Sequence, residues 1–343
     1  MALIAVAWYG LPFYAANVIA YSRRRYPEHD FVIVSTQVGV PYVGIEELIG
    51  VPVKWVDSTE PISWAALGTP VPDVCIITSW NHKAYLSLAL EARTKRGAKI
   101  IAMVDNYFHG TAKQWAGAIY FRLRLRRIFS AMWVPGVRSR RFMGFLGMPD
   151  ACIFEGLYTA DPLVFYPPSI SIERHRVIFV GQFIPRKGVG EIVKFLNTAS
   201  GILWRTRLRM IGHGPLEAEL RSAGMPIEPF MQPIELGGAY REASALLLPS
   251  RMDHWGVVAH EAALCGCLIL ATRQCGSVDD LVEHGQNGFI MNESSSLEIE
   301  RALAWLEGLS IEQINAARII SIAKASSFSP RNWSNTLAEI ASL

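Results

Sequence analysis

The chain has 343 residues, a length that suits two domains of ordinary size better than one small core. Hydrophobic residues make up 51% of it and charged residues 18%, and the formal net charge of +3 is too small for a dedicated nucleic-acid binder. The five cysteines form no CxxC pair and no metal-binding spacing, and their apolar contexts are typical of reduced core residues in a cytoplasmic protein.

Residues 1–22 carry no charged side chain and are followed by three arginines, a pattern also found in membrane spans and signal anchors. However, no basic residue precedes this apolar run, and a Tyr-Gly-Leu-Pro sequence at 9–12 interrupts it. We therefore predict a buried strand over 3–8, a glycine turn, and a helix over 13–24. A membrane-anchored protein is the alternative.

Up to about residue 166, short apolar runs alternate with helix-like segments. Their continuous rather than alternating apolar character indicates parallel strands that are buried on both faces. The predicted strands are 3–8, 31–36, 53–56, 74–78, 99–104 and 132–134.

Residues 119–133 mix arginines with aromatic and aliphatic residues. At helical spacing Arg122 and Arg126 share one face, whereas the apolar residues crowd another. A basic amphipathic helix of this kind suits peripheral contact with an anionic membrane surface. The alternative is a core helix with a solvated basic side.

Residues 158–171 contain Asp-Pro and Pro-Pro pairs and are predicted to be a linker. A second series of strands follows at 177–180, 207–211, 245–248, 268–271 and 289–291. We predict an α/β protein with two Rossmann-like doubly wound domains facing a central cleft, residues 1–165 and 166–327, with a C-terminal helix over 328–343 that rejoins the first domain. Ligands in such folds bind at the carboxyl ends of the strands.

Two loops of the second half follow predicted strands and carry candidate ligand-binding groups. In the first, Lys187 is a mobile cation able to reach a diphosphate, and Gly188 lets the next helix begin close by. The second, which starts at Gly212, lacks the third glycine of a dinucleotide-binding fingerprint. Solvated surface loops are the alternative in both places.

Residues 249–280 are the most informative part of the sequence. They predict a loop that holds Asp253 and a helix that starts at Gly256 and carries Glu261. The start of a helix presents unpaired N–H groups and a positive dipole end, which suit phosphate. Glu261 lies among apolar neighbours, where a lone carboxylate is costly without partners. Because carboxylates suit hydroxyls, we predict a ligand with both phosphate and polyol, such as a nucleotide-sugar.

These segments resemble the retaining nucleotide-sugar glycosyltransferases of GT-B fold, the group 1 family. Asp253 and Glu261 stand where that family has its E-x7-E motif, and residues 253–256 stand at its E-G-F-G. The resemblance is specific over 156–292, and over 1–155 it is mostly topological. Three further segments resemble its Gly-rich turn, its nucleobase-side segment and its interdomain loop, respectively 275–282, 230–250 and 156–161.

The resemblance implies a role for each donor-side residue. Lys187 would hold the leaving phosphate, Asp253 a sugar hydroxyl and Glu261 the ribose hydroxyls. The further donor-binding candidates are Gln182, Arg186, Gly212, Gly256, Val257 and Val258. Gly10, after the first predicted strand, could let the backbone approach the donor phosphate, with a plain turn glycine as the alternative. Gln182 stands where the family usually has arginine, with Arg186 as a candidate substitute, and Asp253 replaces the commoner glutamate.

The N-terminal half is predicted to receive the acceptor. Asp105, followed by Asn106, ends the strand 99–104 and is the candidate acceptor-binding group or base, with a helix cap or turn as the alternative. His82 and His109 follow or border strand ends, where each could also be purely structural. We assign no metal ligand, because the sequence has no Asp-x-Asp triplet, and Lys187 with the helix start would stabilise the departing diphosphate.

The resulting hypothesis is a cytoplasmic, metal-independent, retaining glycosyltransferase, a hexosyltransferase that needs no cofactor. It would move a sugar from a UDP- or GDP-sugar to a glycan or lipid-linked acceptor in bacterial surface polysaccharide or glycolipid synthesis. Residues 119–133 would place it on the inner face of the membrane. The alternatives are a nucleotide-sugar epimerase of the same fold, which needs no acceptor, and a donor-binding protein without catalysis.

Overall fold

The computed structural model describes residues 1–37, 43–57, 60–169 and 176–342. They divide into two compact units, Met1–Thr159 with Phe328–Leu343, and Ala160–Ser327. The second unit begins at Ala160, before the predicted boundary at 165/166. Residues 164 and 165 belong to it because Nη1 of Arg241 donates to the carbonyl oxygen of Val164 at 3.2 Å, and the ring of Phe165 packs against Tyr240. Positions 170–171 of the predicted linker, and residue 343 of the predicted last helix, lie outside the described residues.

The first unit is built on a parallel sheet with strand order β3-β2-β1-β4-β5-β6-β7. The strands are β1 (Leu3–Tyr9), β2 (Asp30–Thr36), β3 (Val53–Trp55), β4 (Val74–Thr78), β5 (Lys99–Met103), β6 (Ala131–Trp133) and β7 (Ile153–Phe154). The six predicted strands are confirmed to within one residue at each end. The short edge strand β7 carries too few residues to give a pattern of its own.

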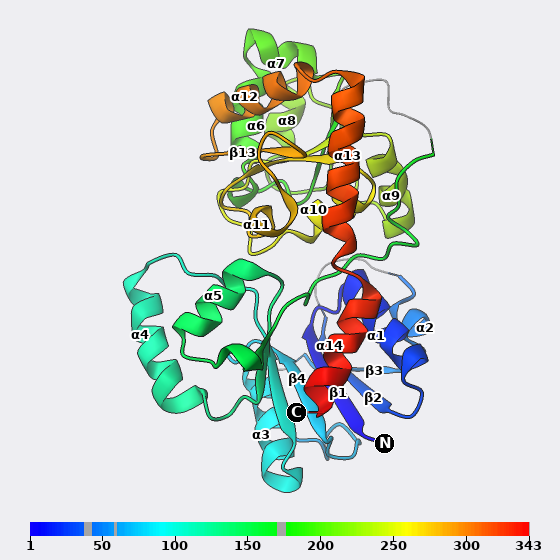
Figure 1. Cartoon of the computed structure of the whole chain (residues 1–343), viewed down its shortest axis with the longest axis vertical. Coiled ribbons are helices and arrows are strands. Elements are labelled where there is room, and N and C mark those ends of the chain that lie inside the picture. Colours follow the sequence, from blue (N-terminus) through cyan, green and yellow to red (C-terminus); the bar gives the residue numbers. More distant parts are fainter. Residues whose placement is uncertain (38–42, 58–59, 170–175, 343) are drawn as a thin grey trace. The chain divides into compact units, whose positions relative to one another are not determined.

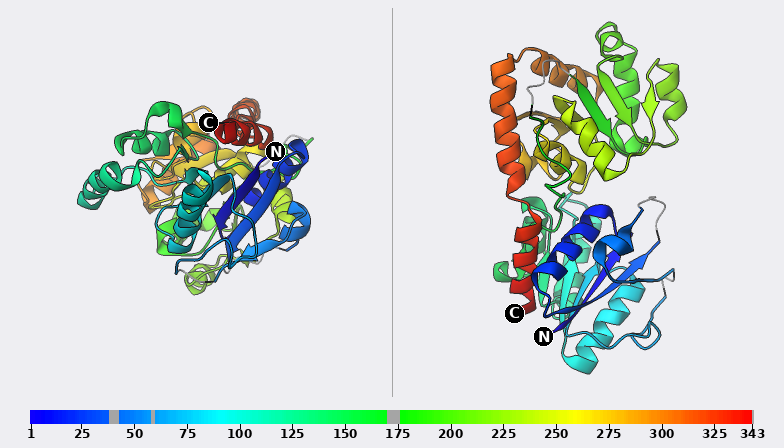
Figure 2. Two further views of the ribbon diagram at one scale, coloured as in Figure 1. Left: turned by 90° about the horizontal axis from the view of Figure 1, so that it is seen from below. Right: turned by 90° about the vertical axis from the view of Figure 1, so that its right-hand side faces the viewer.

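Helices cover both faces of this sheet, as Figure 1 shows. They are α1 (Phe13–Arg25), α2 (Ile45–Ile49), α3 (Lys83–Arg96), α4 (Ala112–Tyr120), α5 (Val137–Phe145) and α14 (Pro330–Ser342), with a π-helical turn η1 (Phe121–Leu125) and a 3-10 turn η2 (Asp150–Cys152). The last helix, α14, lies beside α1 (Figures 1 and 2). Trp333 on α14 stacks on Trp133 with 4.5 Å between ring centroids and donates to the carbonyl oxygen of Leu157 at 3.1 Å. The C-terminal helix is therefore part of the core of the first unit.

The apolar N-terminal run forms β1 and α1, as predicted. β1 is buried between β2 and β4, and α1 buries small and β-branched side chains against the same sheet. In the described ranges, no helix is both long and apolar enough to cross a membrane. Burial inside the unit, rather than lipid, accounts for the apolar character of this segment.

The prediction of a single helix over 119–133 is wrong in extent. The helical segment begins in α4 and ends with η1 at Leu125, and residues 131–133 form the buried strand β6. Trp133 on β6 pairs with Met103 on β5. A short apolar run is compatible with a helix or a buried strand, and pairing in the sheet decided between them. Arg122 and Arg126 are nevertheless both exposed, as the predicted polar face requires.

The second unit has a parallel sheet with strand order β10-β9-β8-β11-β12-β13. Its strands are β8 (Val177–Val180), β9 (Leu208–Ile211), β10 (Ile227–Glu228), β11 (Ala245–Leu248), β12 (Leu268–Thr272) and β13 (Gly288–Met291). Its helices are α6 (Val189–Leu196), α7 (Ala199–Trp204), α8 (Glu217–Ser222), α9 (Pro233–Arg241), α10 (Val257–Leu264), α11 (Val278–Leu281), α12 (Ser296–Glu307) and α13 (Ile311–Ser326), with a 3-10 turn η3 (Pro185–Lys187).

Both sheets reverse their strand order at one point. In the first unit the chain moves outward from β1 through β2 to β3 and then returns to β4 on the other side of β1. The second unit does the same from β8 through β10 to β11. Loops that leave neighbouring strands in opposite directions open a crevice at the carboxyl ends, which is the usual ligand site of doubly wound sheets.

Candidate functional site

The loop after β8 lies against the end of β11. Gly188 has φ +75°, and a Cβ added there would stand 1.9 Å from the carbonyl oxygen of Pro249. Only glycine fits this position, because of both the left-handed backbone and the close approach. The consequence is that η3, and Lys187 at its end, is held next to the loop that follows β11.

Lys187 and Asp253, predicted separately as a phosphate-binding cation and a sugar-binding acid, form an ion pair. Nζ of Lys187 lies 2.5 Å from Oδ2 of Asp253, which is only 7% exposed. A Cβ added at Gly256 would meet the same Oδ2 at 3.4 Å. The pair therefore lies directly beside the start of α10.

The loop that carries Asp253 is fixed by hydrogen bonds to the turn after β12. The Asp253 N–H donates to the carbonyl oxygen of Gln274 at 3.1 Å, and the Gly276 N–H donates back to the carbonyl oxygen of Asp253 at 3.0 Å. The buried indole of Trp255 donates to Oδ2 of Asp280 at 2.9 Å. The acidic residue at the end of the Gly-rich turn thus positions this loop, a role that the sequence did not indicate.

Helix α10 begins at Gly256, as predicted, with this residue at φ +84°. The first N–H groups of a helix, here those of Val257 and Val258, have no acceptor within it. The helix dipole adds a partial positive charge at the same place. With Lys187 nearby, the start of α10 is suited to bind an anion.

Glu261 lies one turn further along α10 and is held by a residue of another helix. The hydroxyl of Tyr240 on α9 donates to Oε2 of Glu261 at 3.2 Å. Burial raises the pKa of Glu261 to about 7, and the hydrogen bond from Tyr240 opposes this change. Tyr240 is fully buried, and burial raises its own pKa well above 10. Further hydroxyl donors would favour the ionised form of this carboxyl group, and the ribose hydroxyls are the ligand predicted for it.

The other donor-side candidates have different surroundings. Nη1 of Arg186 donates to the carbonyl oxygen of Met252 at 3.0 Å, so this guanidinium supports the loop that leads to Asp253. Gln182 is exposed. The Gly212 N–H donates to the carbonyl oxygen of Glu228 at 2.9 Å, beyond the end of β9. One nitrogen of Arg186 is therefore engaged by the backbone, and its role as a substitute for an arginine at position 182 stays a prediction.

His260, which the sequence did not single out, is fully buried next to Glu261. Its Nδ1 accepts from the Ala160 N–H at 3.0 Å, so Nε2 carries the proton and donates to the carbonyl oxygen of Ala325 at 2.9 Å. Ala160 begins the second unit, and Ala325 lies near its end. One side chain of α10 thus binds both chain segments that connect this unit to the first.

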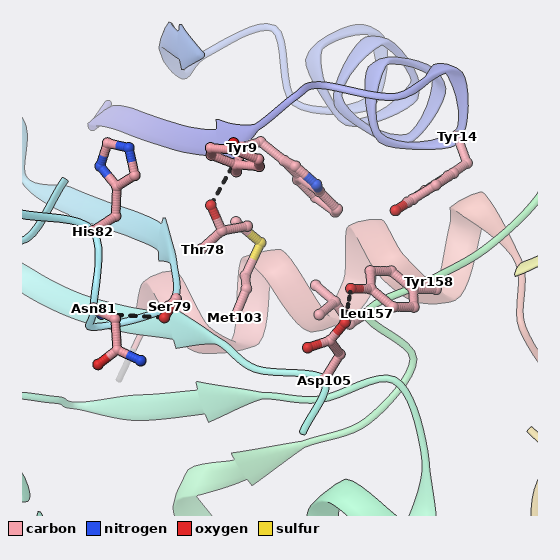
Figure 3. Close-up of a pocket in the computed structure, with 11 residues that line it drawn as sticks. Tyr9, Tyr14, Thr78, Ser79, Asn81, His82, Met103, Asp105, Leu157 and Tyr158 are labelled. Carbon is pink, nitrogen blue, oxygen red and sulfur yellow. Dashed lines mark hydrogen bonds between the residues drawn. The ribbon is translucent and has the colours of Figure 1, made fainter. Parts of the chain in front are cut away.

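In the first unit, a pocket of about 450 Å³ opens at the carboxyl ends of β1, β4 and β5 (Figure 3). Asp105 and His82, both predicted, line it, together with the end of β1 and the segment around Tyr158. Ser79, another lining residue, has φ +63°, a conformation that non-glycine residues rarely adopt away from functional sites. The glycine turn after β1, with Gly10 at φ +77°, follows directly on the lining residue Tyr9.

Three aromatic side chains form one wall of this pocket. Tyr14 meets Trp8 and Tyr158 edge to face, with ring centroids 6.0 Å and 5.4 Å apart. Figure 3 shows the hydroxyl of Tyr14 directed toward Tyr158. The sequence did not predict this wall, because its members come from β1, α1 and a loop far along the chain.

Asp105 is fixed at the floor of the pocket. The hydroxyl of Tyr158 donates to its Oδ2 at 3.0 Å, and Ser139 donates to its backbone carbonyl oxygen at 3.0 Å. His82 stacks on Tyr85 at 4.0 Å, and burial lowers its pKa. Asn106 and His109 do not line this pocket, and the His109 ring packs on Tyr107 at 4.2 Å.

Comparison with known proteins finds a family model that matches most of the second unit. Residues 174–307 match the family model described as "Glycosyl transferases group 1". The chain is 30% identical over 184 residues to a D-inositol 3-phosphate glycosyltransferase of Acidothermus cellulolyticus, and 31% identical over 127 residues to a sulfoquinovosyl transferase of Arabidopsis thaliana. These matches cover 48% and 35% of the chain and only 39% and 24% of the two relatives. The chain thus spans well under half the length of either relative.

Solved structures match the whole chain. The Anabaena protein HepE in complex with UDP has a TM-score of 0.75 at 16% identity, with full coverage of both chains. A sucrose-phosphate synthase of Thermosynechococcus elongatus has a TM-score of 0.72 at 10% identity, covering 99% of this chain and 98% of its own. At these identities the likeness establishes the fold, which is the two-domain GT-B arrangement of Rossmann-like domains that the sequence predicted.

Proposed function

We propose that the chain transfers a sugar from a nucleoside-diphosphate sugar to an acceptor hydroxyl, with retention of anomeric configuration and without a metal ion. Its GT-B fold and the match of residues 174–307 to the group 1 glycosyl transferase model support this. The observation that carries this proposal is the grouping of Lys187 and Asp253 at the start of α10, with Glu261 one turn further along. Together these groups offer positive charge for a diphosphate and carboxylates for hydroxyl groups.

The departing diphosphate gains negative charge in the transition state. Lys187 and the N–H groups at the start of α10 would stabilise it, since preorganised donors and charges act most strongly where charge develops. The ion pair with Asp253 keeps the Lys187 ammonium in place before the donor binds. Asp253 would then accept a hydroxyl of the transferred sugar, and Glu261 the hydroxyls of the ribose. HepE was solved with UDP, which makes a UDP-sugar the first donor to test.

The acceptor would bind in the pocket of the first unit. Asp105 has one carboxylate oxygen engaged by Tyr158, and Figure 3 shows the other pointing away from that tyrosine. This second oxygen would accept a hydrogen bond from the attacking hydroxyl. A nucleotide-sugar epimerase of the same fold would need no such pocket, and a donor-binding protein without catalysis would not turn over its donor.

The experiment that tests the proposal starts with the donor. UDP-, GDP- and ADP-sugars are added to the intact chain and the melting temperature is measured, because a ligand that binds only the folded state stabilises it. The preferred donor is then used in an assay of nucleoside diphosphate release, and NMR identifies the anomer of the product. Absence of both stabilisation and donor cleavage would refute the proposal, as would a product of inverted configuration for its retaining part.

Glu261 provides the matching variant. Glu261→Gln should weaken donor binding about 10- to 100-fold, the value of a hydrogen bond to a charged group. Glu219→Gln, at an exposed glutamate on α8 of the same unit, is the control and should bind donor like the wild type. Equal donor affinity in the two variants would remove Glu261 from the site.

We further propose that α4 and η1 contact an anionic membrane, which would serve a lipid-linked acceptor. Only Ala118 of α4 is buried, and four large apolar side chains nearby are more than half exposed: Trp115, Ile119, Tyr120 and Leu123. The exposed arginines Arg124, Arg126 and Arg127 follow directly. Aromatic and aliphatic side chains bordered by arginines fit a membrane surface, because its acyl chains are apolar and its headgroups are negatively charged. We thus propose for α4, η1 and the arginines that follow them the membrane role predicted for 119–133.

Vesicle sedimentation tests this contact. Binding is expected to vesicles that contain phosphatidylglycerol and to be weak with phosphatidylcholine alone. The double variant Ile119→Asp, Leu123→Asp should lose it, and Ile319→Asp, at an exposed isoleucine on α13, should retain it. Equal binding to both kinds of vesicle, or retention in the double variant, would refute it.

A cytoplasmic location fits the five cysteines, all of which are free.

A further inference from the structure

The pocket of the first unit differs from a phosphate site in its charge. Asp105 is the only Asp, Glu, Lys or Arg among its described lining residues, so the formal charge of the lining is negative. Residues 38–42 and 58–59, which the structure does not describe, contain no lysine or arginine either. Binding of a phosphate or carboxylate usually relies on arginine or lysine.

Two basic residues at the start of α3 do not change this balance. His82 lines the pocket, but burial lowers its pKa, which favours the neutral ring. Lys83, the next residue, is not a lining residue, and its Nζ pairs with Oε1 of Glu60 at 3.3 Å. The start of α3 is capped, because Nδ1 of His82 accepts from the Tyr85 N–H. Among the described lining residues of this pocket, therefore, an anionic acceptor would meet repulsion from Asp105 and no lysine or arginine.

The remaining lining groups suit a carbohydrate ring. Tyr9 at the end of β1 is 54% exposed and presents an aromatic face, next to the wall of Trp8, Tyr14 and Tyr158. Aromatic faces bind the apolar C–H side of a sugar through packing. The hydroxyl and amide groups of Thr78, Ser79 and Asn81 also line the pocket and can exchange hydrogen bonds with sugar hydroxyls. A volume of about 450 Å³ lies in the range of small-ligand sites.

We propose that this pocket binds the acceptor as an uncharged sugar ring, packed on the Tyr9 side chain and hydrogen-bonded to Asp105, and that it excludes rings bearing a phosphate or carboxylate. This inference rests on the proposed transferase function and specifies its acceptor. It does not follow from the fold, because the charge of the pocket is set by side chains at strand ends and not by the sheet.

The experiment compares two matched acceptor panels. The first holds p-nitrophenyl glycosides of glucose, galactose, mannose and N-acetylglucosamine, and the second holds the 6-phosphates of the same glycosides together with p-nitrophenyl glucuronide. Release of nucleoside diphosphate from the preferred donor is measured with each. At least one neutral glycoside is expected to stimulate release, and its charged counterpart is expected to be at least tenfold less effective. Stimulation by a charged acceptor at the level of its neutral counterpart, or by no neutral glycoside, would overturn the inference.

Variants of Tyr9 separate packing from general damage to the fold. Tyr9→Ala should raise the KM for the neutral acceptor about three- to tenfold, whereas Tyr9→Phe, which keeps the aromatic face, should retain the wild-type KM. Donor affinity should be unchanged in both. An unchanged acceptor KM in Tyr9→Ala would remove Tyr9 from the site. The melting temperature with donor is measured alongside, because absence of both donor stabilisation and donor cleavage refutes the proposed function. Nucleoside diphosphate release that only charged acceptors stimulate refutes this inference alone.

Discussion

The two units place different chemistry at the carboxyl ends of sheets that are built in the same way. The second unit gathers charged groups, with Lys187 and Asp253 in an ion pair and Glu261 held by Tyr240. The first unit gathers aromatic rings around a single charge, that of Asp105. Both sheets are parallel and reverse their strand order once. The difference shows that the doubly wound fold supplies the place for a ligand, while the loops supply the chemistry.

The largest expected effect is the loss of kcat when the Lys187 ammonium is removed from the second unit. Lys187→Ala should lower kcat about 10²- to 10³-fold, the usual effect of removing one preorganised group from a developing anion. The matched control is Lys194→Ala, at a lysine of α6 that is largely exposed and pairs with Glu191. Steady-state kinetics with saturating donor and acceptor measure this. A kcat within threefold of the wild type would show that the diphosphate leaves without help from Lys187.

Removing Asp105, the one charged side chain among the described lining residues of the first unit's pocket, should affect acceptor binding and not donor binding. Asp105→Ala is expected to lower kcat/KM for the acceptor about 10- to 100-fold, the value of a hydrogen bond to a charged group. Tyr158→Phe keeps the carboxylate but removes its partner at 3.0 Å, and its effect should be smaller. The donor Kd, measured by calorimetry, should stay at the wild-type value in both. A raised donor Kd in Asp105→Ala would contradict the proposal that donor and acceptor bind to different units.

The charge of Glu261 should make donor binding depend on pH. Its pKa of about 7 means that the ionised fraction falls about tenfold between pH 8 and pH 6, so donor affinity should fall about tenfold over that range. The donor phosphates also titrate, but they do so equally with wild type and variant. Glu261→Gln lacks the titrating carboxyl group, so its donor affinity should depend less on pH. The same profile in wild type and variant would mean that Glu261 does not titrate in the site.

The raised pKa of Glu261 also sets the sign of a stability effect. The folded state holds the proton more tightly than the unfolded chain, so the free energy of unfolding should fall as pH rises from about 4.5 to about 7. Denaturant titrations at pH 5 and pH 8 measure this change. Glu261→Gln, which has no proton to lose, should reduce it.

The smallest expected effect is a gain of affinity. Gln182→Arg restores a cation at a position where Gln182 is exposed and Arg186 is bound to the Met252 carbonyl oxygen. A charge-assisted hydrogen bond to a donor phosphate should tighten the donor Kd about three- to tenfold. Calorimetry with the preferred donor measures this Kd. Gln182→Lys is the comparison, because lysine lacks the planar guanidinium of arginine. An unchanged Kd would show that the loop after β8 does not reach the phosphates from this position.

The sequence predicted most of the secondary structure because strands buried on both faces leave a clear apolar pattern. It failed in the extent of the helix predicted over 119–133, which overlapped the strand predicted at 132–134, because a short apolar run fits either element. It also missed the acceptor-side wall of Trp8, Tyr14 and Tyr158. Aromatic residues in separate segments look like ordinary core residues until the sheet brings them together.

By itself the sequence determined the order of strands and helices, the glycine that opens α10, and the spacing of Asp253 and Glu261, since these depend on residues close along the chain. Tertiary structure alone decided which groups are partners. Lys187 meets Asp253, Tyr240 binds Glu261, and His260 ties α10 to both connecting segments. The physical reason is that a buried polar group must find a hydrogen-bond partner wherever the fold provides one, and sequence separation does not restrict that choice.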